Sequence, residues 1–283
     1  MRSGLEELTV VVPVRNGELW VERCLQSIAD AQPAEIIVVD GLSTDRTAQL
    51  ASARGVRILS DDGRGVATAR VLGAEAARTR FVALVDVDVV LHDSALQTLL
   101  DEFVRDGYTG LQAGLDSVSG KGYWGRALTH HHRCGRSKHW FGVVATIFER
   151  DALLAHGLDE RFKSGEDIDL RWRLQQAGAK LGVSRETVVE HRFDDTWEFA
   201  KGQWLADGHG LGRMVAVHGA RSLLLLALPL AGAVRGAGLS LVRRQPRWLP
   251  YFACYCAYNY VGMFGEIWKR LQRRGATTAP SAA

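Results

Sequence analysis

The sequence predicts an α/β fold of the doubly wound type, followed by an apolar helical tail. Short apolar runs rich in Val and Ile alternate with segments whose apolar residues recur at helical spacing. Such alternation is typical of a parallel sheet with helices on both faces, and ligands of these sheets bind at the carboxyl ends of the strands. With 283 residues, of which 47% are hydrophobic and 24% charged, the chain can bury one large core and an appendage.

Each element is predicted from its local pattern. Four apolar runs bounded by polar or Gly-containing turns predict buried strands at 8–14, 35–39, 56–59 and 81–85. Helices with one apolar face are expected between them, at 19–29, 44–54 and 67–77. Downstream we expect helices at 93–107 (capped by Asp93 or Ser94), 151–156 and 166–177, and strands at 108–115, 142–148 and 180–189. Residues 116–140, which hold four of the nine histidines, are expected to form a loop.

The last quarter of the chain differs in charge from the rest. Residues 211–283 hold ten Lys and Arg against one acid, Glu266, so this segment carries +9, whereas the first 210 residues, with 25 basic and 31 acidic side chains, carry −6. Its basic residues interleave with two apolar stretches, 222–242 and 248–268, rather than forming one polar run that would suit nucleic acid. This pattern favours helices that lie in the interface of an anionic membrane.

Two other interpretations of the tail stay open, namely a soluble helical pair packed on the α/β domain and a hairpin that spans the membrane. Each apolar stretch approaches the roughly 20 residues that a spanning helix needs. A spanning hairpin would, however, place Arg243, Arg244 and Arg247 on the far side, against the tendency of basic loops to remain cytoplasmic. We therefore expect an α/β domain over 1–210, membrane-associating helices over 211–274 and a disordered end over 275–283.

Cysteine usage and the N-terminus indicate the compartment. The four cysteines have neither the density nor the spacing of a disulfide framework or a zinc site, which favours a reducing environment. Residues 1–9 lack the charged-then-apolar order of a signal peptide. The expected location is the cytoplasmic face of the cell membrane, with peripheral or monotopic attachment.

Two carboxylates follow the fourth predicted strand. Asp86 and Asp88 are two positions apart, so an extended backbone sends both side chains the same way. Hard oxygen ligands of this kind hold Mg²⁺ or Mn²⁺, which can neutralise a bound diphosphate. An Asp-x-Asp sequence alone is common on solvated loops, but its position after a buried strand favours a metal site.

Further acids open the helix predicted at 166. Helix N-termini stabilise carboxylates, so plain capping by Glu166 and Asp167 is one explanation. The other is catalysis, because a carboxylate near the metal but not bound to it could take the proton of an attacking hydroxyl. Asp167 is the candidate base, and Glu166 would position the acceptor or the base. His191, which follows the last predicted strand, could complete the metal site, although an isolated histidine is more often structural.

Other polar residues could bind a nucleotide. Asp40 follows the second predicted strand and could accept hydrogen bonds from a base or a ribose, although it could also serve a plain helix-capping turn. Gly63 and Gly65 leave room for the backbone to approach a phosphate, and Arg70 on the next helix could clamp it. This glycine pattern matches neither a Walker motif nor a dinucleotide fingerprint.

The residues described above, taken in their order along the chain, resemble the inverting glycosyltransferase family 2. The catalytic domain of this family has the GT-A fold, a mixed sheet flanked by helices. The resemblance covers about residues 8–195 and rests on 11–16 with 24–28, 38–47, 65–70, 86–88 and 148–170. Each segment is weak alone, and the set is specific. It departs from the family at Gly17, where an acid is common, and at Gly41, where an acid or a serine is frequent. It also lacks the Gln-x-x-Arg-Trp motif of processive synthases, so a single addition is expected.

The resemblance implies a metal-assisted direct displacement that moves one sugar from a nucleotide-diphosphate sugar to a hydroxyl or phosphate. Carried over by position, it assigns Pro13, Arg15 and Asp40 to the nucleoside, Arg70, Asp86 and Val87 to the donor site, Asp86, Asp88 and His191 to Mg²⁺ or Mn²⁺, and Asp167 with Glu166 to catalysis. A UDP- or GDP-sugar is the expected donor.

The acceptor and the activity itself leave alternatives. The basic, aromatic tail favours a lipid-linked or other membrane-proximal acceptor, covered by a lid over residues 130–139, although such a His- and Arg-rich stretch could simply be solvated. A nucleotidyltransferase would share the sheet and the metal carboxylates, but its Gly-rich, Lys-bearing signature near the first strand is absent. A non-catalytic sugar-nucleotide-binding or scaffold protein is the remaining alternative.

Overall fold

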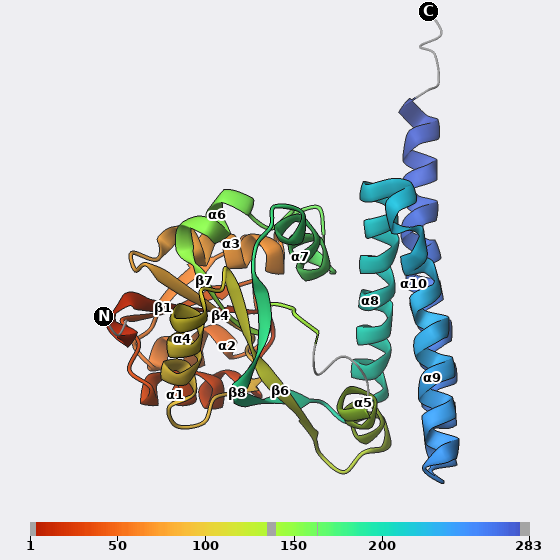
Figure 1. Cartoon of the computed structure of the whole chain (residues 1–283), viewed down its shortest axis with the longest axis horizontal. Helices are drawn as coiled ribbons and strands as arrows, with labels where there is room; N and C mark the ends of the chain where they lie inside the picture. The colour runs from red at the N-terminus through yellow and green to blue at the C-terminus, as the bar shows by residue number, and fades with distance from the viewer. Residues whose placement is uncertain (1–3, 135–139, 163, 278–283) are drawn as a thin grey trace, which may run out of the picture. The chain divides into compact units, whose positions relative to one another are not determined.

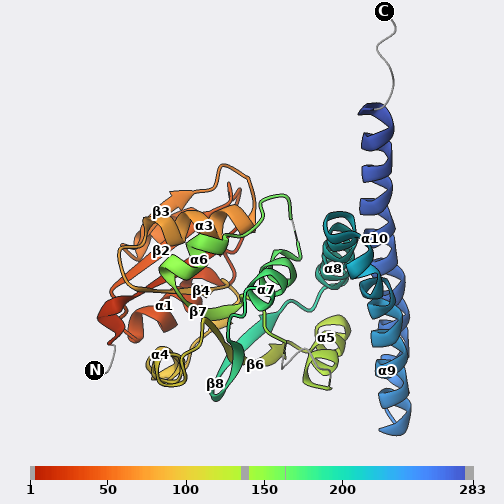
Figure 2. The same cartoon turned by 45° about the horizontal axis from the view of Figure 1, so that its top comes forward.

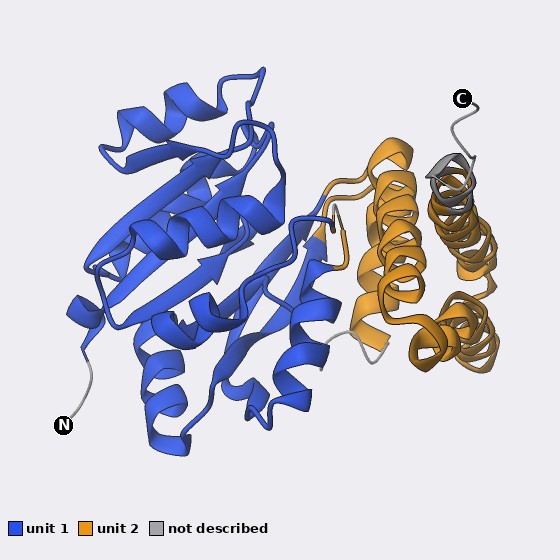
Figure 3. Ribbon diagram, turned by 90° about the horizontal axis from the view of Figure 1, so that it is seen from above, with its two compact units in different colours: residues 1–118, 136–161, 166–193 blue, residues 119–135, 162–165, 194–283 orange. Residues whose placement is uncertain are grey.

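The computed structural model describes residues 4–134, 140–162 and 164–277 (Figure 1). The chain forms two compact units, drawn in different colours in Figure 3. Unit 1 comprises Met1–Val118, Arg136–Arg161 and Glu166–Phe193, and unit 2 comprises Ser119–Gly135, Phe162–Gly165 and Asp194–Ala283. The domain boundary expected at residue 210 falls inside a helix, α8 (Trp197–His218), which continues through that position.

Unit 1 is built on a mixed sheet of eight strands in the order β3-β2-β1-β4-β7-β6-β8-β5. The four strands expected first are parallel, with β1 between β2 and β4, whereas β7 runs antiparallel to β4 and β6. The strands are β1 (Leu8–Val14), β2 (Glu35–Asp40), β3 (Arg57–Ser60), β4 (Phe81–Val85), β5 (Val89–Val90), β6 (Gly110–Ser119), β7 (Ala145–Glu149) and β8 (Leu181–Phe193).

Helices cover both faces of this sheet, as the alternation of patterns predicts (Figure 1). Along β1, Val10 and Val12 face one core and Val11 faces the other, because successive side chains of a strand point to opposite faces. One core includes α1 (Val21–Asp30), α2 (Thr47–Ala53) and α4 (Ala95–Asp106), and the other includes α3 (Val66–Ala76), α6 (Arg150–His156) and α7 (Glu166–Gln176).

Unit 2 is helical and is held together by close backbone contact and by aromatic rings. In Figure 2, α8 lies beside α10. Glycines on α8 permit this approach, since a Cβ on Gly212 would lie 2.6 Å from the carbonyl oxygen of Met263. Trp204 on α8 packs against Trp124 and Tyr251, with ring centroids 5.8 and 5.2 Å away. The remaining elements are α5 (Tyr123–Cys134), η3 (Gly219–Ala227), α9 (Leu228–Val242), η4 (Pro246–Trp248) and α10 (Leu249–Thr277), and η1 (Leu5–Glu7) precedes the sheet.

The structure corrects three expectations about local structure. The loop expected at 116–140 contains α5, so residues 130–134 of the expected lid are helical, and residues 135–139 lie outside the described residues. The last strand extends to Phe193, which places His191 inside β8 rather than after it. Ser94 does stand at the start of α4, but its side chain makes no capping hydrogen bond.

The tail contains a candidate membrane span. Within the described residues, the helical stretch Trp197–Val242 alone is long and apolar enough to cross a membrane by length and composition, with a mean hydropathy of 1.7. Only 22% of its most apolar window is buried. Most of that apolar surface therefore does not pack on the rest of the protein.

Candidate active site

Two loops at the carboxyl ends of β1 and β2 hold each other in place. The backbone N–H of Asn16 donates to Ser43 Oγ, and Asn16 Oδ1 accepts from the N–H of Thr44, both at 2.8 Å. One residue on, the N–H of Gly17 donates to Thr47 Oγ1 at 2.8 Å. Asn16 has a φ of 53°, a left-handed conformation that asparagine adopts more readily than most residues. Several polar residues of these two loops therefore hold the backbone of the expected donor site in place.

The predicted nucleoside contacts lie together on this platform. Pro13 pairs with Val39 across β1 and β2, and Asp40 pairs with the residue before Arg15. Asp40 Oδ2 accepts the N–H of Ser43 at 3.1 Å, whereas Asp40 Oδ1 is buried with no hydrogen-bond partner within the described chain. An unpaired buried acceptor is costly, so Asp40 Oδ1 is suited to a ligand N–H or O–H.

Both departures from the family pattern have steric reasons. A Cβ on Gly41 would lie 3.2 Å from the Cβ of Arg15, which already occupies that side of the loop. A Cβ on Gly17 would lie 2.6 Å from a methyl of Val14 and 3.3 Å from both methyls of Val87. Val87 thus packs against the first loop, and any larger residue at position 17 would overlap Val14 and crowd Val87.

The Asp86-Val87-Asp88 segment forms a turn between β4 and β5. The N–H of Val89 donates to the carbonyl of Asp86 at 3.0 Å, and Asp86 donates to the carbonyl of Val144 at 2.8 Å. Strand β5 then pairs with β8 so that Val89 stands opposite His191. This pairing, which the sequence pattern did not predict, brings His191 Nε2 to 3.4 Å from Asp88 Oδ2.

Asp88 and His191 have unused ligand atoms. Asp88 Oδ1 and His191 Nδ1 are both buried without a hydrogen-bond partner in the described part of the chain. Burial alone would lower the pKa of His191, but the charge and hydrogen bond of Asp88 and the charge of Asp86 together raise it. A carboxylate oxygen and an imidazole nitrogen are suitable donors for a divalent cation, so this pair fits the predicted metal site.

Asp86 is turned toward an arginine rather than toward Asp88. Its Oδ1 accepts from Arg70 Nη2 at 2.6 Å. Burial raises the pKa of Asp86, and the charge of Arg70 opposes this rise. Among the described residues, no three His, Cys, Asp or Glu side chains are already grouped as a metal site.

Two predicted phosphate contacts are engaged within the protein. Arg70 is buried and pairs with both Asp86 and Glu166, so its guanidinium is held by carboxylates instead of facing a phosphate. The N–H groups of Gly63 and Gly65 donate to the carboxylate of Asp61, at 2.7 and 2.9 Å. Asp61 is itself buried and closes the turn that was expected to admit a phosphate.

The acids at the start of α7 have separate partners. Glu166 accepts from Arg70, and Asp169 accepts from Arg173 at 2.8 Å. Asp167 lies beside Gly142, since a Cβ on that glycine would stand 3.2 Å from Asp167 Oδ2. Burial lowers the pKa of Arg171, and the charge of Asp167 opposes that shift. The α7 acids are therefore not equivalent caps of the helix.

One electrostatic cluster links the predicted catalytic and donor residues. Burial would lower the pKa of Arg70, but the charges of Asp86, Glu166 and Asp167 together raise it. Asp88 belongs to the same group, because its charge acts on Asp86 as well as on His191. The turn after β4 and the start of α7 thus converge, as the sequence predicts.

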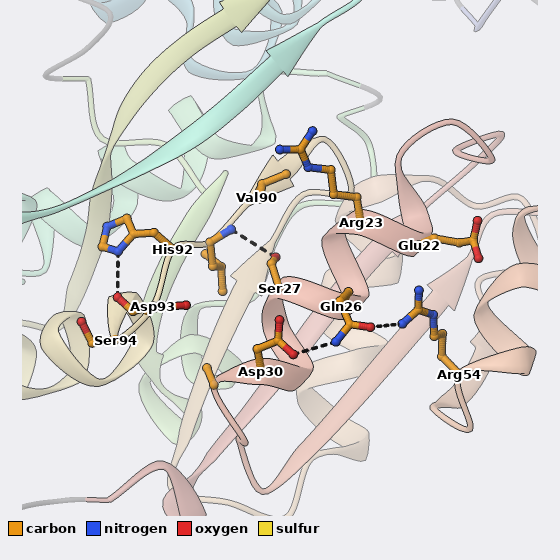
Figure 4. A pocket seen from close by; sticks show the side chains of 12 residues that line it. Glu22, Arg23, Gln26, Ser27, Asp30, Arg54, Val90, His92, Asp93 and Ser94 are labelled. Atoms are coloured by element: carbon orange, nitrogen blue, oxygen red, sulfur yellow. Dashed lines mark hydrogen bonds between the residues drawn. The ribbon is translucent and has the colours of Figure 1, made fainter.

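An open hollow of about 630 Å³ lies elsewhere in unit 1, between α1 and the segment leading into α4 (Figure 4). Its polar side chains bond largely to one another. Gln26 donates to Asp30 at 2.6 Å and accepts from Arg54, and Ser27 accepts the N–H of Leu91 at 3.1 Å. None of the predicted site residues lines it.

Known proteins resemble this chain in sequence. A family model described as glycosyl transferase family 2 matches residues 9–156 and ends before α7 and β8. A pre-mycofactocin glycosyltransferase of Mycobacterium tuberculosis is 30% identical over 203 residues, which cover 65% of this chain and 42% of that protein. A 4,4'-diaponeurosporenoate glycosyltransferase of Staphylococcus aureus is 35% identical over 112 residues, which cover 37% of this chain and 30% of that protein. The chain thus spans less than half the length of these relatives.

Solved structures share the fold. A mannosyltransferase from Pyrobaculum calidifontis, in complex with GDP-Man and Mn²⁺, superposes with a TM-score of 0.63 at 18% identity over 91% of this chain and 87% of its own. Glucosyl-3-phosphoglycerate synthase from Mycobacterium tuberculosis, with UDP and Mn²⁺, gives a TM-score of 0.52 at 20% identity over 74% and 78%. At these identities the similarity confirms the expected GT-A fold, and together with the family match it leads to one conclusion: the chain belongs to glycosyl transferase family 2.

Proposed function

We propose that this protein transfers a single sugar from a UDP- or GDP-sugar to a hydroxyl or phosphate acceptor, with inversion, by metal-assisted direct displacement. The observation that carries the proposal is the pairing of Asp88 with His191. Both have a buried ligand atom without a partner in the described chain, next to the cluster that contains Asp167. The two structural relatives bound to Mn²⁺ and a nucleotide add support.

In the proposed displacement reaction, different residues would bind the nucleoside, hold the metal and accept the proton. Pro13, Arg15 and Asp40 would hold the nucleoside at the ends of β1 and β2. Mg²⁺ or Mn²⁺ held by Asp88 and His191, with Asp86 nearby, would supply positive charge for the leaving diphosphate. Asp167 would accept the proton of the acceptor oxygen as that oxygen attacks the anomeric carbon. No covalent sugar-enzyme intermediate is needed.

A combined binding and turnover experiment tests this proposal. UDP-, GDP- and dTDP-sugars are screened by thermal shift with and without Mn²⁺, because a ligand that binds only the folded state raises its melting temperature. Asp88→Ala should abolish the Mn²⁺-dependent shift. Asp93→Ala, which removes an exposed acid lining the separate hollow, should retain it.

The same screen separates the alternatives. Donor binding without Mn²⁺-stimulated hydrolysis or transfer would support the non-catalytic sugar-nucleotide-binding protein. An unchanged shift in Asp88→Ala would contradict the metal site.

We also propose that unit 2 brings the protein to the cytoplasmic face of an anionic membrane, where a lipid-linked or membrane-proximal acceptor would be found. An apolar stripe on α10 supports this, since Val261, Phe264 and Trp268 are 60, 58 and 63% exposed at helical spacing. On α9, Val234 and Val242 are also exposed. Exposed apolar surface of this extent commonly marks a contact with a protein or a membrane.

The basic residues of the tail favour a lipid surface over a second protein copy. Arg243, Arg244 and Arg247 are exposed at the connection between α9 and α10. The acid of the tail, Glu266, is neutralised by Arg213 at 3.2 Å. Exposed apolar residues on the helices and basic residues where the helices connect suit the headgroup region of an anionic bilayer, where each cation contributes about 1 kcal/mol.

Vesicle sedimentation tests the membrane proposal. The full chain should sediment with vesicles of phosphatidylcholine and phosphatidylglycerol and much less with phosphatidylcholine alone. Phe264→Ser should reduce sedimentation, whereas Leu19→Ser, at an exposed apolar position of unit 1, should leave it unchanged. Equal loss in both variants, or a stable dimer by light scattering with no vesicle binding, would reject the membrane surface.

A further inference from the structure

Arg70 joins two parts of the candidate site that come from different elements. It lies on α3 and its side chain is only 4% exposed. One end of its guanidinium binds Asp86 in the turn after β4, and the other end binds Glu166 at the start of α7, whose side chain is 8% exposed. A planar guanidinium with fixed donor directions constrains two carboxylates in a way that a lysine ammonium does not.

These contacts fix the acids that flank Asp86 and Glu166. Asp88 is two positions after Asp86 in a turn closed by the bond from Val89 N–H to the Asp86 carbonyl. Asp167 directly follows Glu166 in the first turn of α7. Without a cation between them, the half-buried Asp86 and the buried Glu166 would be neighbouring like charges, whose repulsion disfavours the close approach of the turn and the helix.

We propose that Arg70 is a positioning residue, which binds Asp86 and Glu166 and thereby sets the distance between the metal pair Asp88 and His191 and the base Asp167. This inference rests on the proposed glycosyl transfer. It also assigns Glu166 a role different from binding the acceptor, since its carboxylate is engaged by Arg70 inside the protein. The donor need not touch Arg70 for the reaction to depend on it.

Steady-state kinetics of Arg70→Lys and Arg70→Met, with thermal melting of each variant, test the proposal. In Arg70→Met, kcat should fall about 100-fold while the donor KM stays within about threefold, because a misplacement near 1 Å costs about that factor in rate. Arg70→Lys should melt close to the wild type, because it keeps the charge, but its kcat should remain about tenfold low, because one ammonium cannot hold both carboxylates in a plane.

Arg173→Met provides the matched control on α7. Arg173 also pairs with a buried acid, Asp169, and donates to the carbonyls of His156 and Gly157, at 2.5 and 2.9 Å. Its loss should lower the melting temperature as much as Arg70→Met does and leave kcat within about threefold of the wild type.

Two results in folded Arg70→Met would overturn the inference: a kcat within about threefold of the wild type, or a loss confined to the donor KM. So would an equal loss of kcat in Arg173→Met, or full recovery of kcat in Arg70→Lys. If Arg70→Met does not fold, the kcat of Arg70→Lys alone tests the inference. Absence of turnover in the wild type with every nucleotide sugar would instead reject the proposed function.

Discussion

Among single residues, the partner of each acid decides what that acid can do. Glu166 pairs with Arg70, which also binds Asp86 in the turn after β4, whereas Asp169 pairs with Arg173 within α7 itself. Glu166 and Asp169 are buried, whereas Asp167 is half-buried and lies beside Gly142. A base needs an oxygen that a substrate can reach, so Asp167 is the best placed of the three for this role.

Asp167→Asn should therefore lose transfer and keep donor binding. An amide is isosteric with the carboxylate but cannot accept the proton, so we expect kcat to fall by about 100- to 10,000-fold. The thermal shift produced by donor and Mn²⁺ should be unchanged. Asp159→Asn, which alters an exposed ion pair with Arg161, should retain activity. Full activity in Asp167→Asn would remove Asp167 from the base role.

A half-buried histidine, His131, should make unit 2 sensitive to acid. Burial lowers the pKa of His131 to about 4 from 6.5, and neighbouring His130 and Arg235 add to this effect. Below pH 6.5 the unfolded chain binds a proton there that the folded protein does not. The contribution of His131 to stability is thus complete above pH 6.5 and is lost as the pH falls toward about 4.

His131→Phe isolates this effect. The substitution keeps a ring against Phe252 and Tyr255 but removes the titrating group, so the melting temperature should fall less steeply with pH than that of the wild type. His92→Phe, at an exposed histidine, should keep the wild-type slope. Identical slopes in all three proteins would show that His131 is not responsible.

The sequence was sufficient to predict which residues form the candidate site, but not which ion pairs those residues make. Asp86, Asp88, Asp167 and His191 were identified by type and position, and the structure brings them into one neighbourhood. The donor contact given to Arg70 also stays a prediction, and its pairing with Glu166 was missed, because nothing local to α3 reveals that residue 166 folds back onto it. The roles of Asp88, His191 and Asp167 as metal ligands and base stay predictions.

Strands and helices, too, were predicted where the local pattern is clear and missed where they depend on distant residues. Long apolar runs such as β1 and β4 were predicted to within a residue, since burial on both faces leaves an unambiguous pattern. Strand β5 has only two residues and forms because β8 passes beside it. Helix α5 was taken for a loop because the half-buried His131, which contacts Tyr251, is a residue type that sequence patterns count as polar.

The contact between α8 and α10 should depend on particular glycines. A Cβ on Gly208 would overlap the backbone carbonyl of Asn259, so Gly208→Ala should destabilise unit 2 by about 1–3 kcal/mol through overpacking. Gly202→Ala, on the same helix but with no neighbour within 4 Å, should instead stabilise it by up to about 1 kcal/mol. Denaturant unfolding measures both, and a stabilising Gly208→Ala would contradict the tight contact.

For the molecule as a whole, stability should respond to metal and nucleotide together. A ligand present at about 100 times its Kd adds about 2.7 kcal/mol to the folded state. We expect Mn²⁺ with the cognate nucleoside diphosphate to raise the melting temperature and EDTA to cancel most of that increase. His191→Ala should weaken the response, and an increase that survives EDTA would show that binding does not need the cation.

Unit 2 is built from segments that are far apart in the sequence, and this limits where the chain can be truncated or joined to a relative. Helix α5 comes from the middle of the chain, yet Tyr123 donates to the carbonyl of Arg247 at 2.8 Å and His131 lies 3.0 Å from the hydroxyl of Tyr251. A gene shortened after Phe193 would leave α5 without the helices that shield its rings. Chimeras with relatives should therefore exchange residues 119–135, 162–165 and 194–283 together, since none of these segments is a separable module.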